Sequence, residues 1–211
     1  MSSIKLKHSG GNAVSLHPPT SAPSASDVQF RLPTADGSSG QVLKTDGSGN
    51  LSWVTIDDNP ITVYTRYRLT STKTGNQNPI TSGFGTADDG GRGTIGTAVS
   101  QSSGIFTFPV TGIYKIEANW SLINSSNNTT WCDLDIEFSQ DGTNYNTMAR
   151  AVVGNQAGYY MQPVVSLVVD VTNTSTAKAR FKAVFADGST QIRGNGTSDY
   201  TYFDFMRIGD T

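Results

Sequence analysis

The sequence predicts an all-β protein, in which an extended N-terminal arm is followed by an antiparallel β-sandwich. The first observation is composition, because the 211 residues include 26 Thr, 24 Ser and 14 Asn but only 9 Leu and 2 Glu. Helices use Leu and Glu on their two faces, whereas Thr, Val and aromatic residues favour strands and Gly and Asn favour turns. The second observation is that short segments of alternating apolar and polar residues are separated by Gly, Asn and Asp groups. Both observations argue against a helical protein.

Two regions of different composition meet near Asp57-Asp58-Asn59-Pro60. Residues 1–56 contain four of the eight prolines and few large apolar residues, which are too sparse to build a core. We therefore expect this region to be an extended arm that is ordered by contact with another chain. Residues 57–211 are long enough for one antiparallel domain with a core of its own.

The arm contains two copies of a ten-residue pattern. Residues 35–43 (ADGSSGQVL) and 45–53 (TDGSGNLSW) each place an Asp-Gly pair before a short apolar stretch. Because Asp-Gly readily adopts the backbone angles of a tight turn, each copy predicts a turn followed by a strand. Burial of Leu43 and Trp53 between identical chains would stabilise these units, so we place both residues in a trimer interface. A plain flexible linker is the alternative interpretation.

The second region is a series of strands separated by turns at the spacing of a sandwich. We predict strands at residues 61–69, 95–100, 105–109, 113–123, 132–139, 148–153, 164–171, 179–185 and 200–208.

Two of these strands differ in the character of their faces. Along 131–138 (WCDLDIEF), apolar residues alternate with acidic ones, which predicts one face in the core and one in water. The last strand instead carries large apolar residues on both faces. We therefore expect its second face to meet a neighbouring subunit, and we assign Tyr202, Phe203 and Phe205 to the trimer interface.

Charge and hydropathy exclude several classes of partner. The 15 basic and 17 acidic residues are not clustered, which predicts no binding of nucleic acid and no attraction to an anionic membrane. No run approaches the ~18 apolar residues of a membrane span, and residues 1–11 lack the apolar stretch of a secretory signal. We expect a soluble product made in the cytosol. The single Cys132 cannot form an internal disulfide, and its strand position predicts a core side chain.

Motifs for catalysis or cofactor binding are weak. Residues 91–96 (GRGTIG) match a dinucleotide fingerprint formally, but they lie in a Gly/Asp loop with no helix after them. His8 and His17 both lie in the arm, so no Ser/His/Asp or Cys/His set can form within the second region. Carboxylate pairs for glycoside hydrolysis cannot be judged from sequence spacing. We expect no enzymatic activity and no cofactor.

Acidic and aromatic groups offer two further candidates. Asp133, Asp135 and Glu137 could gather a calcium ion, and the loop Asp88-Asp89-Gly90 is a second place for one. Carboxylates two residues apart on a strand do not converge, so we favour a solvated acidic face and expect no bound metal. Exposed aromatic rings could stack on sugars, although such rings more often lie in cores or interfaces. The candidates for sugar stacking are Tyr145, Tyr159, Tyr160 and Trp131.

Residues 105–116 (IFTFPVTGIYKI) resemble the F-x-x-P-x-x-G-x-Y signature of the complement and tumour-necrosis-factor-like jelly rolls. In physical terms Pro109 and Gly112 would form a corner between two strands, while Phe106 and Tyr114 would fill the core. The closing strand of that superfamily, F-S-G-F-x-I, is echoed by residues 203–208 (FDFMRI), where Phe205 replaces the glycine of the family. The resemblance spans about residues 60–211 and implies a ten-stranded jelly roll that assembles as a homotrimer and acts by binding.

The arm has a resemblance of its own. Residues 4–12 (IKLKHSGGN) and the stretch from Leu32-Pro33-Thr34-Ala35-Asp36-Gly37 to Trp53-Val54 look like the N-terminal regions of bacteriophage virion fibre proteins, especially those of marine cyanophages. In such proteins the N-terminus attaches to the particle and the C-terminal domain is displayed outward. The resemblance implies that residues 1–56 bind another virion protein of the tail, adaptor or capsid. The apolar residues expected to make this attachment are Ile4, Leu6, Val14, Leu16, Phe30 and Leu32.

These observations predict a virion structural protein, a homotrimeric short tail fibre or spike whose jelly-roll head binds a glycan or protein of the host surface. The sequence singles out no receptor-binding residue. A head fibre or decoration protein on the capsid is the alternative, and a free carbohydrate-binding module is a second one. A free module has no use for an ordered arm of about fifty residues, which argues against it.

Overall fold

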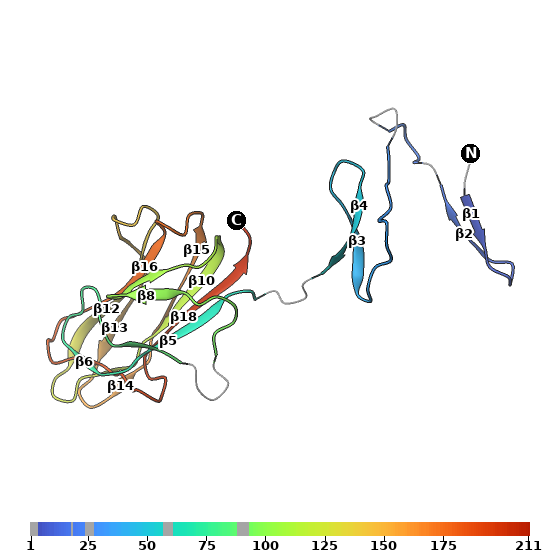
Figure 1. Ribbon diagram of the computed structural model, residues 1–211. Coiled ribbons are helices and arrows are strands. Elements are labelled where there is room, and N and C mark those ends of the chain that lie inside the picture. Colours follow the sequence, from blue (N-terminus) through green and yellow to red (C-terminus); the bar gives the residue numbers. More distant parts are fainter. Residues whose placement is uncertain (1–3, 18, 24–27, 57–60, 88–92) are drawn as a thin grey trace. The chain divides into compact units, whose positions relative to one another are not determined.

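The computed structural model describes residues 4–17, 19–23, 28–56, 61–87 and 93–211. The chain divides into two units, Met1–Asp58 and Asn59–Thr211, and the composition change at residues 57–60 lies outside the described residues. The predicted all-β class is confirmed, because every regular element in these ranges is a strand (Figure 1). Within the described residues no helix has the length and apolar character needed to cross a bilayer.

The first unit contains two antiparallel hairpins. One is formed by β1 (Ile4–Lys7) and β2 (Ala13–Leu16), and the other by β3 (Gln41–Thr45) and β4 (Leu51–Thr55). The second hairpin pairs the two copies of the repeated pattern with each other, which confirms both predicted strands. The predicted Asp-Gly turn forms at Asp46-Gly47, whereas the turn of the first copy lies at residues 39–40. The hairpin turn is closed by the Asp46 carboxylate, which accepts hydrogen bonds from the backbone N–H groups of Ser48 (2.8 Å) and Asn50 (3.1 Å).

The two repeat copies use glycine differently. Gly47 and Gly49 adopt the positive φ angles that a tight turn requires. In the first copy Gly40 does so, whereas Gly37 lies against the Trp53 ring, where an added Cβ would lie 2.5 Å from Cδ2. The second Asp-Gly pair is therefore a turn element, while the glycine of the first makes room for an indole.

The second unit is a β-sandwich of two five-stranded antiparallel sheets, extended by a short four-stranded sheet. One five-stranded sheet has the order β15-β10-β18-β5-β7 and the other the order β13-β12-β16-β9-β8, while the short sheet has the order β14-β11-β17-β6. The strands are β5 (Tyr64–Leu69), β6 (Lys73–Thr74), β7 (Phe84–Thr86), β8 (Ser100–Ser102), β9 (Ile105–Thr107), β10 (Gly112–Asn119), β11 (Leu122–Ile123), β12 (Thr129–Ser139), β13 (Asn146–Asn155), β14 (Tyr160–Met161), β15 (Val164–Val171), β16 (Lys178–Phe185), β17 (Gln191–Ile192) and β18 (Tyr202–Gly209).

Two strand predictions differ from the structure. The predicted strand at 95–100 does not form, because Gly96 adopts a positive φ and its Cα approaches the Thr62 carbonyl so closely that the chain turns there. An isolated bridge between Ile95 and Tyr64 remains, and Ser100 at the other end of the range begins β8. The predicted strand at 113–123 is split into β10 and β11, which belong to different sheets. The split occurs where Trp120 N–H bonds to the carbonyl of Pro163 (2.9 Å), a residue with no N–H to continue the ladder.

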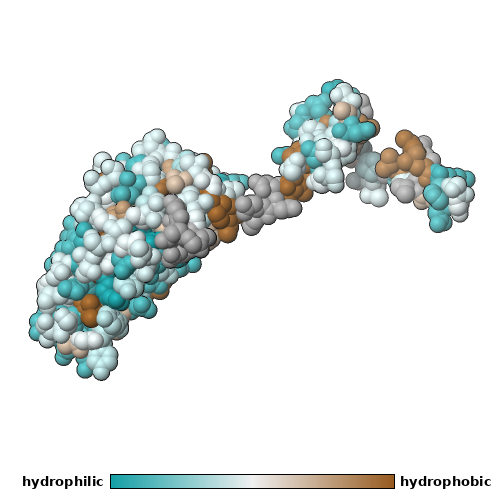
Figure 2. Space-filling model, turned by 60° about the horizontal axis from the view of Figure 1, so that its bottom comes forward, coloured by the Kyte–Doolittle hydropathy of each residue, from teal (hydrophilic) through white to brown (hydrophobic). Residues whose placement is uncertain are grey.

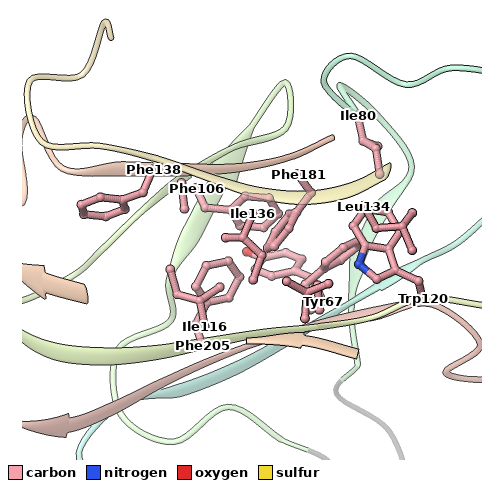
Figure 3. Packing of buried hydrophobic residues seen from close by; sticks show 14 of the residues in the cluster. Tyr67, Ile80, Phe106, Ile116, Trp120, Leu134, Ile136, Phe138, Phe181 and Phe205 are labelled. Carbon is pink, nitrogen blue, oxygen red and sulfur yellow. The ribbon is translucent and has the colours of Figure 1, made fainter. Parts of the chain in front are cut away.

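The core lies between the two five-stranded sheets and is rich in aromatic rings (Figure 3). Phe106 is fully buried at its centre, with a stacked contact to Phe205 (centroids 4.9 Å apart) and an edge contact to Phe181 (5.2 Å). Phe181 in turn stacks on Phe203 (4.1 Å). Ring pairs at these distances stabilise the fold beyond the burial of their apolar area. Because one ring contacts the next, the sandwich has a continuous core within one chain.

The jelly-roll signature residues lie at the start of β10. Tyr114 is fully buried and its hydroxyl donates to the Val110 carbonyl (3.0 Å). Gly112 is buried with φ +143°, and an added Cβ would lie 2.6 Å from the Gly209 carbonyl oxygen. Pro109 is half-buried. The corner thus needs a glycine because β18 passes directly over it.

Candidate interaction surfaces

The hairpin β1–β2 presents apolar side chains to solvent. Ile4 pairs with Leu16 across the hairpin, and Leu6 pairs with Val14. Ile4, Leu6 and Leu16 are each 65% exposed. A two-stranded hairpin has no second layer on which to bury such residues, so this one offers a ready contact face.

A second apolar surface belongs to the hairpin β3–β4 and the segment before it. Leu43 lies directly opposite Trp53, whose indole Nε1 donates to the Ala35 carbonyl (2.9 Å). The segment at Arg31 joins β4 by a parallel bridge to Asn50. These contacts build a shallow pocket that is lined by Leu32, Pro33, Thr34, Ala35, Asp36, Leu43 and Trp53.

Phe30 and Leu32 extend the apolar surface of the first unit. They are 71% and 72% exposed, respectively. Figure 2 likewise shows hydrophobic surface open on the first unit, whereas the viewed face of the jelly-roll unit is mainly hydrophilic or neutral. Five of the six residues expected to make the attachment are thus exposed to solvent. The side chain of the sixth, Val14, is not among those described.

The outer face of the sheet β15-β10-β18-β5-β7 is the best candidate for contact between subunits. Along β18 the residues alternate, so that Tyr202 and Met206 face outward while Phe203 and Phe205 are fully buried. The assignment of Phe203 and Phe205 to the trimer interface is therefore wrong, because both rings pack into the core of their own chain. Tyr202 is the member of the predicted set on this strand that a second chain can reach.

Paired charges lie on this outer face. The Arg66 guanidinium binds both carboxylate oxygens of Asp204 (2.7 and 2.6 Å), and it also contacts the Tyr202 ring (4.0 Å to the centroid). Asp199 provides a second carboxylate for Arg66 (3.2 Å). Tyr64 donates to Asp204 (3.1 Å), and burial together with that carboxylate raises the pKa of Tyr64 to about 12. The charges of Arg66 and Asp204 are thus paired within one chain, and Tyr64, Tyr202 and Met206 lie around them as contact groups on this part of the face.

The acidic row on β12 is an ion-paired ladder. Asp135 has no exposed side-chain surface and is held by Arg150 (2.6 Å) and Lys182 (3.0 Å). Glu137 is paired with Arg180 (2.5 Å). The expectation of a solvated acidic face is therefore wrong for these residues, because long cationic side chains from the strands on both sides cover the carboxylates.

The electrostatics of Asp135 follow from this ladder. Burial alone would raise the pKa of Asp135, but the hydrogen bonds and charges of Arg150 and Lys182 outweigh it and lower the pKa. Asp133 adds a weaker contact with Arg150 (3.4 Å). The three carboxylates have matching cations, so this row is built for stability rather than for holding a metal ion.

A pocket of about 450 Å³ opens at the edge between the two five-stranded sheets. The Asp141 carboxylate on its rim accepts hydrogen bonds from its own loop, and these hold the pKa of Asp141 well below its ordinary value. The lining residues are Phe138, Gln140, Asp141, Asn144, Asn146, Met148, Val168, Val169 and Asp170.

The other candidate residues lie apart. Cys132 is buried, which raises the pKa of its thiol to about 11. His8 lies at the end of β1, where its Nδ1 accepts from the backbone of Gly10 (3.1 Å). The described ranges hold no group of three His, Cys, Asp or Glu side chains arranged for a metal ion. The loop Asp88-Asp89-Gly90 and the first two residues of the 91–96 motif lie outside those ranges.

The aromatic candidates lie at three places. Tyr145 holds the Arg180 guanidinium over its ring (4.0 Å), and Trp131 is partly exposed on β12. Tyr159 and Tyr160 are well exposed at the start of β14. Sequence reasoning did not identify Arg193, which lies between the rings of Tyr160 and Tyr200, because no periodicity in the sequence links these three segments.

No protein-family model matches the chain, and no curated protein matches it. Solved structures do resemble the jelly-roll unit. Murine APRIL at pH 5.0 matches with a TM-score of 0.51 and 10% identity over 69% of this chain and 98% of that chain. Eiger TNF from S. frugiperda matches at 0.49 and 7% identity, over 72% and 96% of the two chains. The vertex protein P5 of PRD1 matches at 0.45 and 14% identity, over 71% and 99%.

These likenesses describe the fold and nothing further. The match with murine APRIL covers nearly all of that chain. The expected all-β jelly-roll fold is therefore confirmed.

Proposed function

We propose that this chain is a bacteriophage virion structural protein, a homotrimeric short tail fibre or spike. Its first unit attaches to the particle, and its jelly-roll unit is displayed for binding to the host surface. The observation that carries the proposal is the contrast between the two units. The jelly roll buries an aromatic core, whereas the first unit leaves apolar residues open on the hairpin β1–β2 and on the segment before β3.

The attachment role is supported by the chemistry of the first unit. Six apolar residues of this unit are expected to make the contact, and five of them have described, highly exposed side chains. Burying one such side chain stabilises a complex by about 1.5–3 kcal/mol, which is ample for docking several hairpins on a partner. The resemblance of these segments to virion fibre proteins of cyanophages names the kind of partner, another protein of the particle. The six residues are Ile4, Leu6, Val14, Leu16, Phe30 and Leu32.

Trimer formation is supported by the outer face of the sheet β15-β10-β18-β5-β7. Interfaces are enriched in Tyr, Met and Arg and depleted of unpaired charge, and this face presents Tyr64, Tyr202 and Met206 around internally paired Arg66. The opposite sheet instead presents a ladder of charged side chains, with Arg150, Arg180 and Lys182 over the carboxylates of β12. We accordingly assign Tyr202 to the trimer interface, together with Leu43 and Trp53 in the arm.

Incorporation into particles tests the proposal. We expect a chain that lacks residues 1–56 to remain folded but to be missing from purified particles. A full-length variant with Ile4, Leu6 and Leu16 changed to Ser should be missing as well, because its contact face is polar. Its matched control changes Lys7, Ser15 and His17 to Ala on the same hairpin and should be incorporated normally. Normal incorporation of the truncated chain would contradict the attachment role.

The position of the protein in an image of the intact particle separates the two virion roles. Density at the tail supports the short tail fibre or spike. Density on the capsid supports the alternative, a head fibre or decoration protein with the same two units. Absence from particles leaves a free carbohydrate-binding module as the remaining candidate.

A further inference from the structure

Three segments meet around the guanidinium of Arg193 at the end of the jelly roll that carries the four-stranded sheet. Arg193 follows β17, and its backbone N–H bonds to the Ser121 carbonyl (2.8 Å). Tyr160 begins β14 in the same sheet, and Tyr200 lies just before β18. The guanidinium carbon lies 4.3 Å from the centroid of the Tyr160 ring and 4.1 Å from that of Tyr200. Two rings thus fix the orientation of one cation.

Arg193 differs from the other arginines of the jelly roll. In the part of this unit that the structure describes, each of the other five forms an ion pair with a carboxylate. Arg193 has no carboxylate partner among the described residues, and its guanidinium makes one long hydrogen bond, from Nη1 to Ser121 Oγ (3.4 Å). A guanidinium carries five N–H donors, so most of them are available to an external acceptor. The five paired arginines are Arg66, Arg68, Arg150, Arg180 and Arg207.

The acceptor that suits this group is a carboxylate. A planar guanidinium binds a carboxylate through two parallel hydrogen bonds, and stacking on aromatic rings holds the guanidinium in the required plane. Because the rings already fix the cation, little conformational entropy is lost when the anion binds.

The surroundings favour a sugar as the carrier of that carboxylate. Tyr159 and Tyr160 are 63% and 58% exposed, respectively, so apolar ring surface with a polar tip lies beside the cation. Such rings contact the apolar faces of sugars while their hydroxyls remain hydrated. A small inorganic anion would use the guanidinium but leave this aromatic surface uncovered.

We propose that Arg193, Tyr160 and Tyr200 form a binding site for a sugar that bears a carboxylate, such as a uronic or a sialic acid. Arg193 binds the carboxylate, and Tyr160 with its neighbour Tyr159 contacts the ring. The assignment of this sugar to a host surface rests on the proposed function, whereas the binding itself does not.

Calorimetric titration of the full-length protein tests the site. The probes are trigalacturonic acid and sialyllactose, with lactose as the neutral sugar and inorganic phosphate as the bare anion. We expect binding of at least one acidic probe and none of lactose. Arg193→Gln should weaken that binding about tenfold or more, since it removes a charge-assisted bidentate contact. Lys178→Gln removes the same charge from the outer face of β16 and should leave the affinity unchanged.

The alternative outcomes are distinct. Equal binding of the acidic probes by the wild type and Arg193→Gln would overturn the site, and so would the absence of binding to both probes. Phosphate binding as tight as that of the acidic sugars would show an anion site without sugar recognition. If light scattering shows that Arg193→Gln breaks an oligomer of the wild type, Arg193 pairs with a carboxylate of a neighbouring subunit and the proposal fails. If the wild type is a monomer and still binds the acidic probes, the proposed trimer is contradicted and the proposed sugar site is not.

Discussion

Single residues decide which side chains this fold can use for contact. In β18, Phe203 and Phe205 point into the core while Tyr202 and Met206 point outward. The sequence shows large apolar residues on both faces of this strand. It does not show which face is internal, because that depends on how β18 pairs with β5 and β10. Glycines act at the same scale, since Gly112 fixes the corner at which β10 begins.

Replacing Gly112 with Ala should destabilise the jelly roll by about 2 kcal/mol or more. Its φ of +143° strains a residue with a side chain, and the new Cβ would lie 2.6 Å from the Gly209 carbonyl oxygen. Urea unfolding at fixed protein concentration measures the loss. Gly188→Ala is the matched control, because a Cβ there meets no atom within 4 Å. Equal stability of the two variants would argue against the close approach of β18.

At the scale of elements, the sequence predicted long alternating strands well and short ones poorly. The strand at 164–171 is found with the predicted bounds, because β15 is a long Val-rich run that ends before Thr172-Asn173. Two-residue strands such as β11 and β17 carry no periodicity of their own and exist only because neighbouring strands supply partners. The ladder on β12 was missed as well, since its cations come from β13 and β16, far along the chain.

The ladder predicts a pH dependence for stability. The pKa of Asp135 is lowered in the folded protein. The contribution of Asp135 to the free energy of unfolding is therefore complete above the pKa of the unfolded state, about 3.9, and is lost as the pH falls through the pKa of the folded state. Asp135→Asn should cost about 3 kcal/mol at pH 7, because two cations lose a buried partner. This difference from the wild type should shrink below about pH 4.

Unfolding measured at several pH values tests this dependence on Asp135. Asp170→Asn, which removes an exposed carboxylate from β15, should cost less than about 0.5 kcal/mol at neutral pH. A difference for Asp135→Asn that stays constant down to pH 2 would mean that the ladder does not hold this carboxylate ionised.

In the arm, Trp53 ties the hairpin β3–β4 to the segment before it. Trp53→Ala removes the hydrogen bond to Ala35 and the contact with Gly37. We expect amide hydrogen exchange in β3 and β4 to accelerate about tenfold or more, while the jelly-roll core keeps its protection. Ser52→Ala on the same strand is the control and should leave the exchange of both units unchanged. Unaltered exchange in Trp53→Ala would show that the indole does not stabilise this hairpin.

At the scale of the whole molecule, the two units divide the tasks of the proposed spike. The jelly roll has a core of its own, and the face proposed for contact between subunits is the sheet around β18. The first unit has contact surface without a core. Sequence composition indicated this division, and the structure identifies the exposed faces that other chains can contact.

A charge on the proposed subunit face should prevent assembly. Met206→Asp places a carboxylate on the outer side of β18, where burial against another chain would be costly. Sedimentation analysis should show a smaller species than the wild type at micromolar concentration. Val152→Asp, on the exposed face of β13, should sediment as the wild type does. If Val152→Asp sediments as a smaller species while Met206→Asp sediments as the wild type does, the interface lies on the opposite sheet.

The trimer is the central claim, and light scattering of the full-length protein in solution tests it most directly. We predict a mass three times the 22.5 kDa of a single chain at micromolar concentration. A mass equal to that of one chain would contradict the account.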